Sequence, residues 1–320
     1  MIYVLLLIGF VCLVKGADFF VSGSSAVARY FHIPTFVIGL TIVAFGTSLP
    51  EAAVSVTAAL REANGIAVGN VLGSNLFNLL VVLGASALIK TCPVSKSTLR
   101  FEYPLSIAAA VLLLILCSGG SVHASSLSLS RFDGVLLLIV FTLFLFFTVR
   151  SVLSARDIPA EYDALEEDET ISLPRGIILS IVGVAGIIIG GDVVVDSATE
   201  IAESFGIDET LIGLTIVAMG TSLPELVTSI VAALKGETDI AVGNVIGSNI
   251  FNLLFVLGLS TVIHPIRVTA FSIYDSLILI LVSLLLYVPM IRKKALTRSW
   301  GVLLLLLYTF YLAYIIMRTM

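Results

Sequence analysis

Two acidic residues attract attention because each lies in a long apolar stretch and each belongs to the same pentapeptide. The sequence TSLPE occurs at 47–51 and again at 221–225, so that Glu51 and Glu225 follow a proline in both copies. A carboxylate is costly at membrane depth, and such a residue is a functional candidate by default. Carboxylate, hydroxyl and carbonyl oxygens are the ligands of hard cations such as Ca²⁺. The two pentapeptides therefore predict a cation site.

The proline of each pentapeptide, Pro50 or Pro224, predicts a break in its helix. Proline has no backbone N–H, so the carbonyl four residues earlier, at Gly46 or Gly220, loses its helical donor. Non-helical backbone at this depth is tolerated only where it is buried in protein or lines a water-filled cavity. The alternative is that each Ser-x-x-Glu forms a capping box for the restarted helix. Such a cap explains the serine but does not need a charge in mid-bilayer.

The composition is that of a membrane protein. Of 320 residues, 58% are hydrophobic and 12% are charged, against about 25% charged in ordinary soluble domains. The net charge of -5 and the lack of a basic cluster among aromatics argue against nucleic-acid binding. Ten segments are long and apolar enough to cross a bilayer, at 2–28, 33–60, 64–89, 101–118, 132–153, 175–202, 208–234, 239–263, 272–290 and 299–318.

Basic residues fix the expected orientation. With the N-terminus outside, most Lys and Arg fall in connections that face the cytoplasm, as the positive-inside rule requires. Both termini are then outside a cell membrane, and the acidic connection 154–174 is cytoplasmic. A Ca²⁺-sensing loop is the alternative for this connection, but it lacks the Gly-centred acids of an EF-hand. We interpret it as a solvated linker.

The chain contains an internal duplication. Segments 38–60 and 66–86 recur, largely identical, at 212–234 and 240–260, with one common offset of 174 residues. We therefore expect two halves, 1–153 and 175–320. Each half holds five spans, an odd number, so the second half is inverted. Transporters built this way bind substrate near the midplane, at the repeat interface; a duplicated channel is the alternative.

The helical rise places both carboxylates at one depth. Glu51 lies roughly 14 Å from the outer end of its span and Glu225 roughly 15 Å from the inner end, in a core of about 30 Å. The two can therefore meet at the midplane, where one Ca²⁺ or two Na⁺ would neutralise them. In the next spans, hydroxyl and amide groups four residues apart share a helical face and could complete the site: Ser74 with Asn78, and Ser248 with Asn252.

Other polar and small residues of the spans receive structural interpretations. Asn75 and Asn249 are expected to be structural. Asp18 and Asp192 share the repeat offset and are interpreted as structural or gating residues, with Lys15 a potential ion-pair partner of Asp18. Glycines at helical spacing predict close helix packing: Gly65, Gly69, Gly73, Gly243 and Gly247.

The sequence gives no sign of an enzyme or of a cofactor. It contains no HExxH pattern, no clustered His and Cys, and no phosphate-binding glycine loop. Cys12, Cys92 and Cys117 are interpreted as unpaired apolar thiols. Energy for transport is therefore expected from an ion gradient, and the chain is interpreted as a monomer in the lipid bilayer.

The paired GTSLPE and GNVxGSNxFN segments resemble the two α-repeats of the cation/Ca²⁺ exchanger superfamily, in its sodium/calcium exchanger branch, of the prokaryotic type without a large regulatory loop. The resemblance implies an all-α integral membrane protein with discontinuous helices at the motifs. It implies Na⁺/Ca²⁺ antiport by alternating access, with the first and sixth spans sliding against the rest. Glu51 and Glu225 would bind Ca²⁺ and share Na⁺. The other implied site residues are Thr47 and Thr221 by their carbonyls, Asn78 and Asn252 at the centre, and Ala44, Ser48, Ser74, Ala218, Ser222 and Ser248 at flanking Na⁺ sites.

Alternatives remain for the counter-ion. K⁺-dependent relatives carry Asp at the position of Asn252, so the amide argues against K⁺ transport. H⁺ is the second candidate counter-ion, because two carboxylates could also carry protons. A Ca²⁺ channel and a non-transporting scaffold are less favoured, since neither explains two matched glutamates in inverted halves.

Overall fold

The computed structural model describes residues 2–31, 33, 35–61, 64–120, 127–155, 171–205 and 218–319, and nearly all of them are helical. In the first half the helices, with π-helical turns labelled η, are α1 (Ile2–Phe31), α2 (Thr35–Ile38), η1 (Gly39–Val43), α3 (Ala44–Thr47), α4 (Leu49–Leu60), α5 (Asn64–Phe77), η2 (Asn78–Val82), α6 (Leu83–Ile89), η3 (Thr98–Glu102), α7 (Tyr103–Ile115), η4 (Leu116–Gly120) and α8 (Arg131–Ala155). In the second half they are α9 (Leu173–Ser204), α11 (Ala218–Gly220), α12 (Leu223–Leu234), α13 (Thr238–Ile250), η6 (Phe251–Val256), α14 (Leu257–Ile263), α15 (Ala270–Lys293) and α16 (Arg298–Thr319).

The described helices confirm a multi-pass, all-helical membrane protein. Eight are long and apolar enough to span a bilayer. A ninth span is the broken pair Phe36–Thr47 and Leu49–Leu60, which bends by 46°, close to the position predicted from Pro50. Helix α12 is the C-terminal part of the expected span 208–234; residues 208–217 lie outside the described part of the chain.

Burial is distributed as a bilayer requires. Large apolar side chains such as Ile181 and Phe310 are exposed on the outside, whereas Glu51, Glu225 and Asn78 are fully buried. Exposed apolar surface on this scale marks contact with lipid. The polar residues must therefore satisfy one another in the interior, because the hydrocarbon offers them no partner.

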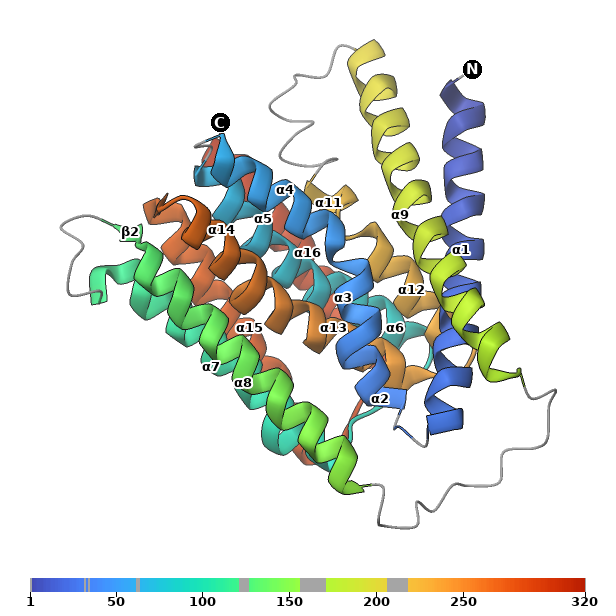
Figure 1. The fold of residues 1–320 in the computed structure, drawn as a ribbon. Helices are drawn as coiled ribbons and strands as arrows, with labels where there is room; N and C mark the ends of the chain where they lie inside the picture. The colour runs from blue at the N-terminus through green and yellow to red at the C-terminus, as the bar shows by residue number, and fades with distance from the viewer. Residues whose placement is uncertain are drawn as a thin grey trace.

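Helices α1 and α9 form a long pair at one side of the molecule (Figure 1), and α1 packs against α12 of the remaining bundle. Glycines let the two backbones approach closely along this pair. A Cβ at Gly16 would lie 2.7 Å from the backbone nitrogen of Ile187, and one at Gly183 would lie 2.5 Å from that of Phe20. Small residues at such a seam are typical of membrane helix pairs.

The remaining helices form a bundle in which helices of one half pack against helices of the other. Helix α6 packs on α16 and α8 packs on α14, with Gly84 meeting Gly301 and Gly134 meeting Gly258. Short antiparallel strands also connect the two halves: β1 (Cys92–Pro93) pairs with β4 (Ala295–Leu296), and β2 (Ser128–Leu129) pairs with β3 (Ile266–Arg267). Each pairing joins one half of the chain to the other.

The glycines of α13 confirm the packing predicted for them. A Cβ at Gly243 would lie 2.5 Å from the carbonyl oxygen of Phe36, and one at Gly247 would overlap that of Leu40. For Gly65, Gly69 and Gly73 no described atom lies so close. The residues that the repeat places opposite Gly69 and Gly73 fall in 206–217, outside the described residues.

Candidate cation site

The two helix breaks have nearly the same backbone geometry. Ser48 precedes α4 with φ −88° and ψ 10°, and Ser222 precedes α12 with φ −92° and ψ 6°. This bridge region is sparsely populated and common among functional residues. Pro50 and Pro224 each lie in the first turn of the restarted helix, where a missing N–H costs nothing.

The capping alternative is wrong, because neither serine side chain caps its own helix. Ser48 Oγ instead donates to Glu225 Oε1 at 2.7 Å, and Ser222 Oγ donates to Glu51 Oε1 at 2.9 Å. Ser248 Oγ also donates to Glu225 Oε1, at 3.4 Å. The serine of each pentapeptide therefore holds the carboxylate of the other pentapeptide, which brings both motifs together in one buried cluster.

Each carboxylate keeps one oxygen uncommitted within this cluster. Glu51 Oε2 and Glu225 Oε2 are buried and accept no hydrogen bond from the residues that the structure describes. A buried anionic oxygen without a partner is costly. A hydrated or dehydrated cation is the partner that fits the charge. The described residues contain no group of three or more His, Cys, Asp or Glu side chains, so a ligand set here must combine carboxylates with neutral oxygens.

Four asparagines lock the centre of the bundle. Asn78 Nδ2 donates to Asn249 Oδ1 at 3.1 Å, and Asn252 Nδ2 donates to Asn75 Oδ1 at 3.2 Å. Asn75 and Asn249 also donate to each other's backbone carbonyl, at 3.2 and 3.3 Å. With their amide groups held in this way, Asn78 Oδ1 and Asn252 Oδ1 accept no hydrogen bond from any described residue. Both oxygens are thus available to a cation.

Local helix geometry supports these amides. Asn78 opens the π-helical turn η2, and Asn252 is the second residue of the π-helical turn η6. Such turns interrupt the regular i→i−4 ladder and recur at functional sites. The structural role predicted for Asn75 and Asn249 agrees with these bonds, since their side chains orient the two central amides.

Two further asparagines, Asn70 and Asn244, were not singled out in the sequence. Asn244 Nδ2 donates to Ser229 Oγ at 3.0 Å and to the backbone carbonyl of Glu225 at 3.4 Å. Asn70 repeats these bonds to Ser55 Oγ and the Glu51 carbonyl at 3.0 and 3.3 Å. Each asparagine therefore fixes the helix turn that carries a glutamate. Their shared repeat offset was the signal that could have identified them.

The threonines cross between the halves in the same way. Thr47 Oγ1 donates to Asn244 Oδ1 at 3.1 Å, and Thr221 Oγ1 donates to Asn70 Oδ1 at 3.4 Å. Both threonines are buried. Thr47 Oγ1 also lies 3.1 Å from the carbonyl oxygen of Val43. Both hydroxyls thus bond to protein groups, and the threonine carbonyls are the groups of interest for a cation.

The remaining predicted site residues lie close to these motifs. Ala44 is buried, and its carbonyl accepts from the Ser48 N–H at 3.1 Å. Ser74 Oγ is buried without a hydrogen-bond partner in the described part of the chain. Ala218 begins α11, but its side chain lies outside the described residues.

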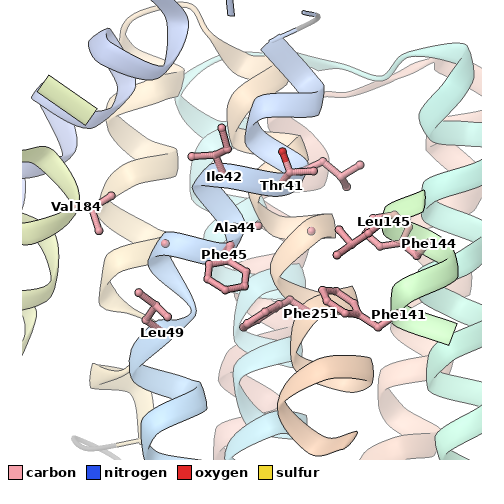
Figure 2. A pocket seen from close by; sticks show the side chains of 13 residues that line it. Thr41, Ile42, Ala44, Phe45, Leu49, Phe141, Phe144, Leu145, Val184 and Phe251 are labelled. Atoms are coloured by element: carbon pink, nitrogen blue, oxygen red, sulfur yellow. The ribbon is translucent and has the colours of Figure 1, made fainter. Parts of the chain in front are cut away.

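An apolar pocket of about 450 Å³ lies beside α3. Its lining includes Thr41, Phe45, Phe141 and Phe251 (Figure 2). Neither glutamate lines it, and it offers almost no polar atoms to a cation. Of the predicted site residues, only Ala44 lines it, so the pocket itself is not the candidate cation site.

Asp18 does not pair with Lys15. Its carboxylate lies 2.6 Å from Lys235 Nζ, at the residue that follows α12. Residues three apart share a helix face, but the partner here comes from a distant part of the chain, which local spacing could not reveal.

Comparison with known proteins assigns the chain to a family. The family model described as sodium/calcium exchanger protein matches residues 1–150 and 175–317. The chain belongs to the sodium/calcium exchanger family. It is therefore a transporter of Na⁺ and Ca²⁺ and not an enzyme, and these ions are its substrates.

Relatives of this exchanger match it over most of their length. It is 34% identical to the sodium/calcium exchanger MaX1 of Methanosarcina acetivorans, over 97% of both chains. It is 43% identical to the inner membrane protein YrbG of Escherichia coli, over 82% of this chain and 79% of that protein. A solved structure of the sodium-calcium exchanger NCX_Mj, soaked with Na⁺ and Sr²⁺, superposes with a TM-score of 0.84 at 33% identity, over 98% of this chain and 97% of that one.

Proposed function

We propose that this exchanger moves Ca²⁺ against Na⁺ by alternating access, and that both ions compete for one mid-membrane site built on Glu51 and Glu225. The observation that carries the proposal is the reciprocal bonding of the two motifs, in which Ser48 holds Glu225 and Ser222 holds Glu51. Because each half supplies part of the other's environment, a cation between the carboxylates would contact both halves at once.

The proposed ligands are all oxygens. Glu51 Oε2 and Glu225 Oε2 supply the charge, and Asn78 Oδ1 and Asn252 Oδ1 supply neutral dipoles. Ca²⁺ takes six to eight such ligands at about 2.3–2.6 Å, so further oxygens are needed. We assign these to the carbonyls of Thr47 and Thr221, with Ala44, Ser48, Ser74, Ala218, Ser222 and Ser248 serving flanking Na⁺ sites.

Competition follows from charge. Two carboxylates in a low-dielectric interior repel each other unless cations neutralise them. One Ca²⁺ satisfies this condition, and so do two or more Na⁺ ions, but not both sets together. Binding of one ion therefore displaces the other, which is the requirement for antiport.

The proposed architecture has ten spans in two inverted five-span halves. The halves are 1–153 and 175–320, joined by the cytoplasmic connection 154–174, with both termini outside. Helix α6 pairs with α16, and α14 pairs with α8. Because the repeat relates α6 to α14 and α16 to α8, these are equivalent contacts of the two halves, which supports this arrangement. Inverted halves that share a midplane site can expose it alternately to either side.

The experiment that tests this function is a flux assay in proteoliposomes. We expect Ca²⁺ uptake when Na⁺ is trapped inside and absent outside, and no uptake when the Na⁺ gradient is removed. Uptake that ignores Na⁺ and follows a pH gradient would support H⁺ exchange instead. A requirement for K⁺ would support the K⁺-dependent alternative, and Ca²⁺ flux without any counter-ion would indicate a channel.

A further inference from the structure

The pair α1–α9 contacts the rest of the bundle unevenly. Helix α1 packs along α12, whereas the equivalent contact in the other half, α9 on α4, is not formed to a comparable extent. In Figure 1, α12 lies beside α1 while α4 leads away from the pair. Of the two equivalent contacts with the helix pair, the one made by α12 is therefore formed and the one expected of α4 is not.

An ion pair marks the contact that is formed. Lys235 Nζ lies 2.6 Å from Asp18 Oδ1, and it also donates to the Asp18 carbonyl at 3.1 Å and to Ser22 Oγ at 2.5 Å. Lys235 directly follows the last residue of α12. The lysine therefore ties the end of α12 to the middle of α1.

The repeat supplies a second set of these groups. The offset of 174 residues places Asp192 of α9 at the position of Asp18, and Lys235 at the position of Arg61, which directly follows α4. The position of Ser22 is taken by Asp196. Arg61 and Asp192 are both exposed, and neither takes part in an ion pair within the described residues.

We propose that Arg61 and Asp192 are positioning residues that form the equivalent ion pair in the opposite-facing state, in which the Asp18–Lys235 pair is open. The inference rests on the proposed alternating access. In the opposite-facing state each half takes the conformation that the other half has here. The contact of α1 with α12 is then lost, and the equivalent contact of α9 with α4 is formed. That movement brings Asp192 to Arg61, on the opposite face of the membrane from Lys235.

The Asp18–Lys235 ion pair is weak enough to open and close between the two states. The side chains of Lys235 and Asp18 are 31% and 37% exposed, and ion pairs of this exposure contribute little to stability. Such a contact biases the position of the helix pair without trapping it. Two similar contacts, one in each state, keep both states populated, since a ligand or contact shifts an equilibrium only by its differential preference.

Reversible cross-linking tests the exchange of partners. In a background with Cys12, Cys92 and Cys117 replaced by Ala, the double variant Arg61→Cys/Asp192→Cys is treated with a short reducible bifunctional thiol reagent in proteoliposomes. We expect a cross-link that stops Na⁺-dependent Ca²⁺ uptake, with uptake restored by reduction. Asp18→Cys/Lys235→Cys should behave in the same way, whereas the mismatched control Asp18→Cys/Arg61→Cys should not cross-link.

The outcomes separate this inference from the proposed function. If the cysteine-free parent exchanges ions and Asp18→Cys/Lys235→Cys cross-links, but Arg61→Cys/Asp192→Cys never does, the second ion pair is refuted and the exchange function stands. If the parent takes up no Ca²⁺ under any Na⁺ gradient, it is the proposed function that fails.

Single variants that neutralise one aspartate should change the Ca²⁺ KM unequally on the two faces of the membrane, which a merely structural role would not do. Asp18→Asn should shift the ratio of Ca²⁺ KM values measured from the two faces of oriented vesicles by about fivefold, equivalent to roughly 1 kcal/mol. Asp192→Asn should shift the same ratio by a similar factor in the opposite direction. Shifts of the same sign, or no shift with Asp192→Asn, would overturn the proposal.

Discussion

Equivalent residues of the two halves make matching contacts at the centre of the molecule, but not at the border of the α1–α9 pair. At the centre the main bonds have counterparts: Ser48 to Glu225 with Ser222 to Glu51, and Asn78 to Asn249 with Asn252 to Asn75. The weak bond from Ser248 to Glu225 at 3.4 Å is the exception, since Ser74 Oγ bonds no described residue. At the border, Asp18 pairs with Lys235 while the equivalent residues stay apart. The duplication is thus preserved where the halves share groups and broken where they contact the helix pair.

Under the proposed alternating access, this difference predicts which part changes during transport. A site whose bonds are reciprocal is nearly the same from either side of the membrane, so it need not be rebuilt when access alternates. In our proposal, the border is where the two states differ, because the Asp18–Lys235 pair opens in one of them. Variants at the centre should therefore affect both directions of transport equally, and variants at the border should affect them unequally.

The largest effect is expected from neutralising either glutamate. Glu51→Gln and Glu225→Gln should each reduce Na⁺-dependent Ca²⁺ uptake by two orders of magnitude or more, because removing one of two buried charges from a cation costs roughly 3–5 kcal/mol. Initial uptake rates in proteoliposomes measure this. Full activity in one of the two variants would break the symmetry of the centre and refute the shared site.

A smaller and matched effect is expected from the serines. Ser48→Ala and Ser222→Ala each remove one hydrogen bond to a carboxylate, worth about 1.5–3 kcal/mol, so both should weaken Ca²⁺ binding by roughly tenfold or more. Ser86→Ala is the control, since among the described residues Ser86 Oγ bonds the Val82 carbonyl one turn earlier and no carboxylate. Competition by Na⁺ for Ca²⁺ in the purified variants measures the loss. A strong effect in one serine variant alone would contradict the reciprocal arrangement.

A stability effect without loss of affinity is expected at the α1–α9 seam. In Gly183→Ala the added methyl group meets the Phe20 backbone, and overpacking of this kind costs about 1–3 kcal/mol. Gly191→Ala in the same helix is the control, because its nearest neighbour, Pro224 Cγ, lies at an ordinary 3.6 Å. Thermal unfolding in detergent should show a lower Tm for Gly183→Ala only. A matching fall in Ca²⁺ affinity would show that the seam and the site are not separable.

The fold was largely predictable because its signals are local. Apolar segment length gave the spans, and the described helices follow them within a few residues at most ends. The proline gave the break, which the structure places at Ser48 with a bend of 46°. The repeat made both glutamates candidates, because a duplicated charge in an apolar segment is visible without any knowledge of contacts.

The partners within the site were not predictable, because they depend on contacts between residues far apart in the chain. The Ser-x-x-Glu spacing indicates a local cap, and only the packed bundle shows that each serine bonds the opposite glutamate. Asn70 and Asn244 have no local signature of their role. Lys235 replaces Lys15 as the partner of Asp18 for the same reason: sequence spacing identifies neighbours along a helix, but not across a bundle.

The central claim is that one cation site is shared by both halves, and equilibrium Ca²⁺ binding to the purified protein tests it most directly. Titration calorimetry should give one Ca²⁺ per chain, displaced by Na⁺, and both Glu51→Gln and Glu225→Gln should abolish that single event. Retention of Ca²⁺ binding at the parent's affinity in either variant, or two independent Ca²⁺ sites of which each variant loses one, would contradict the account.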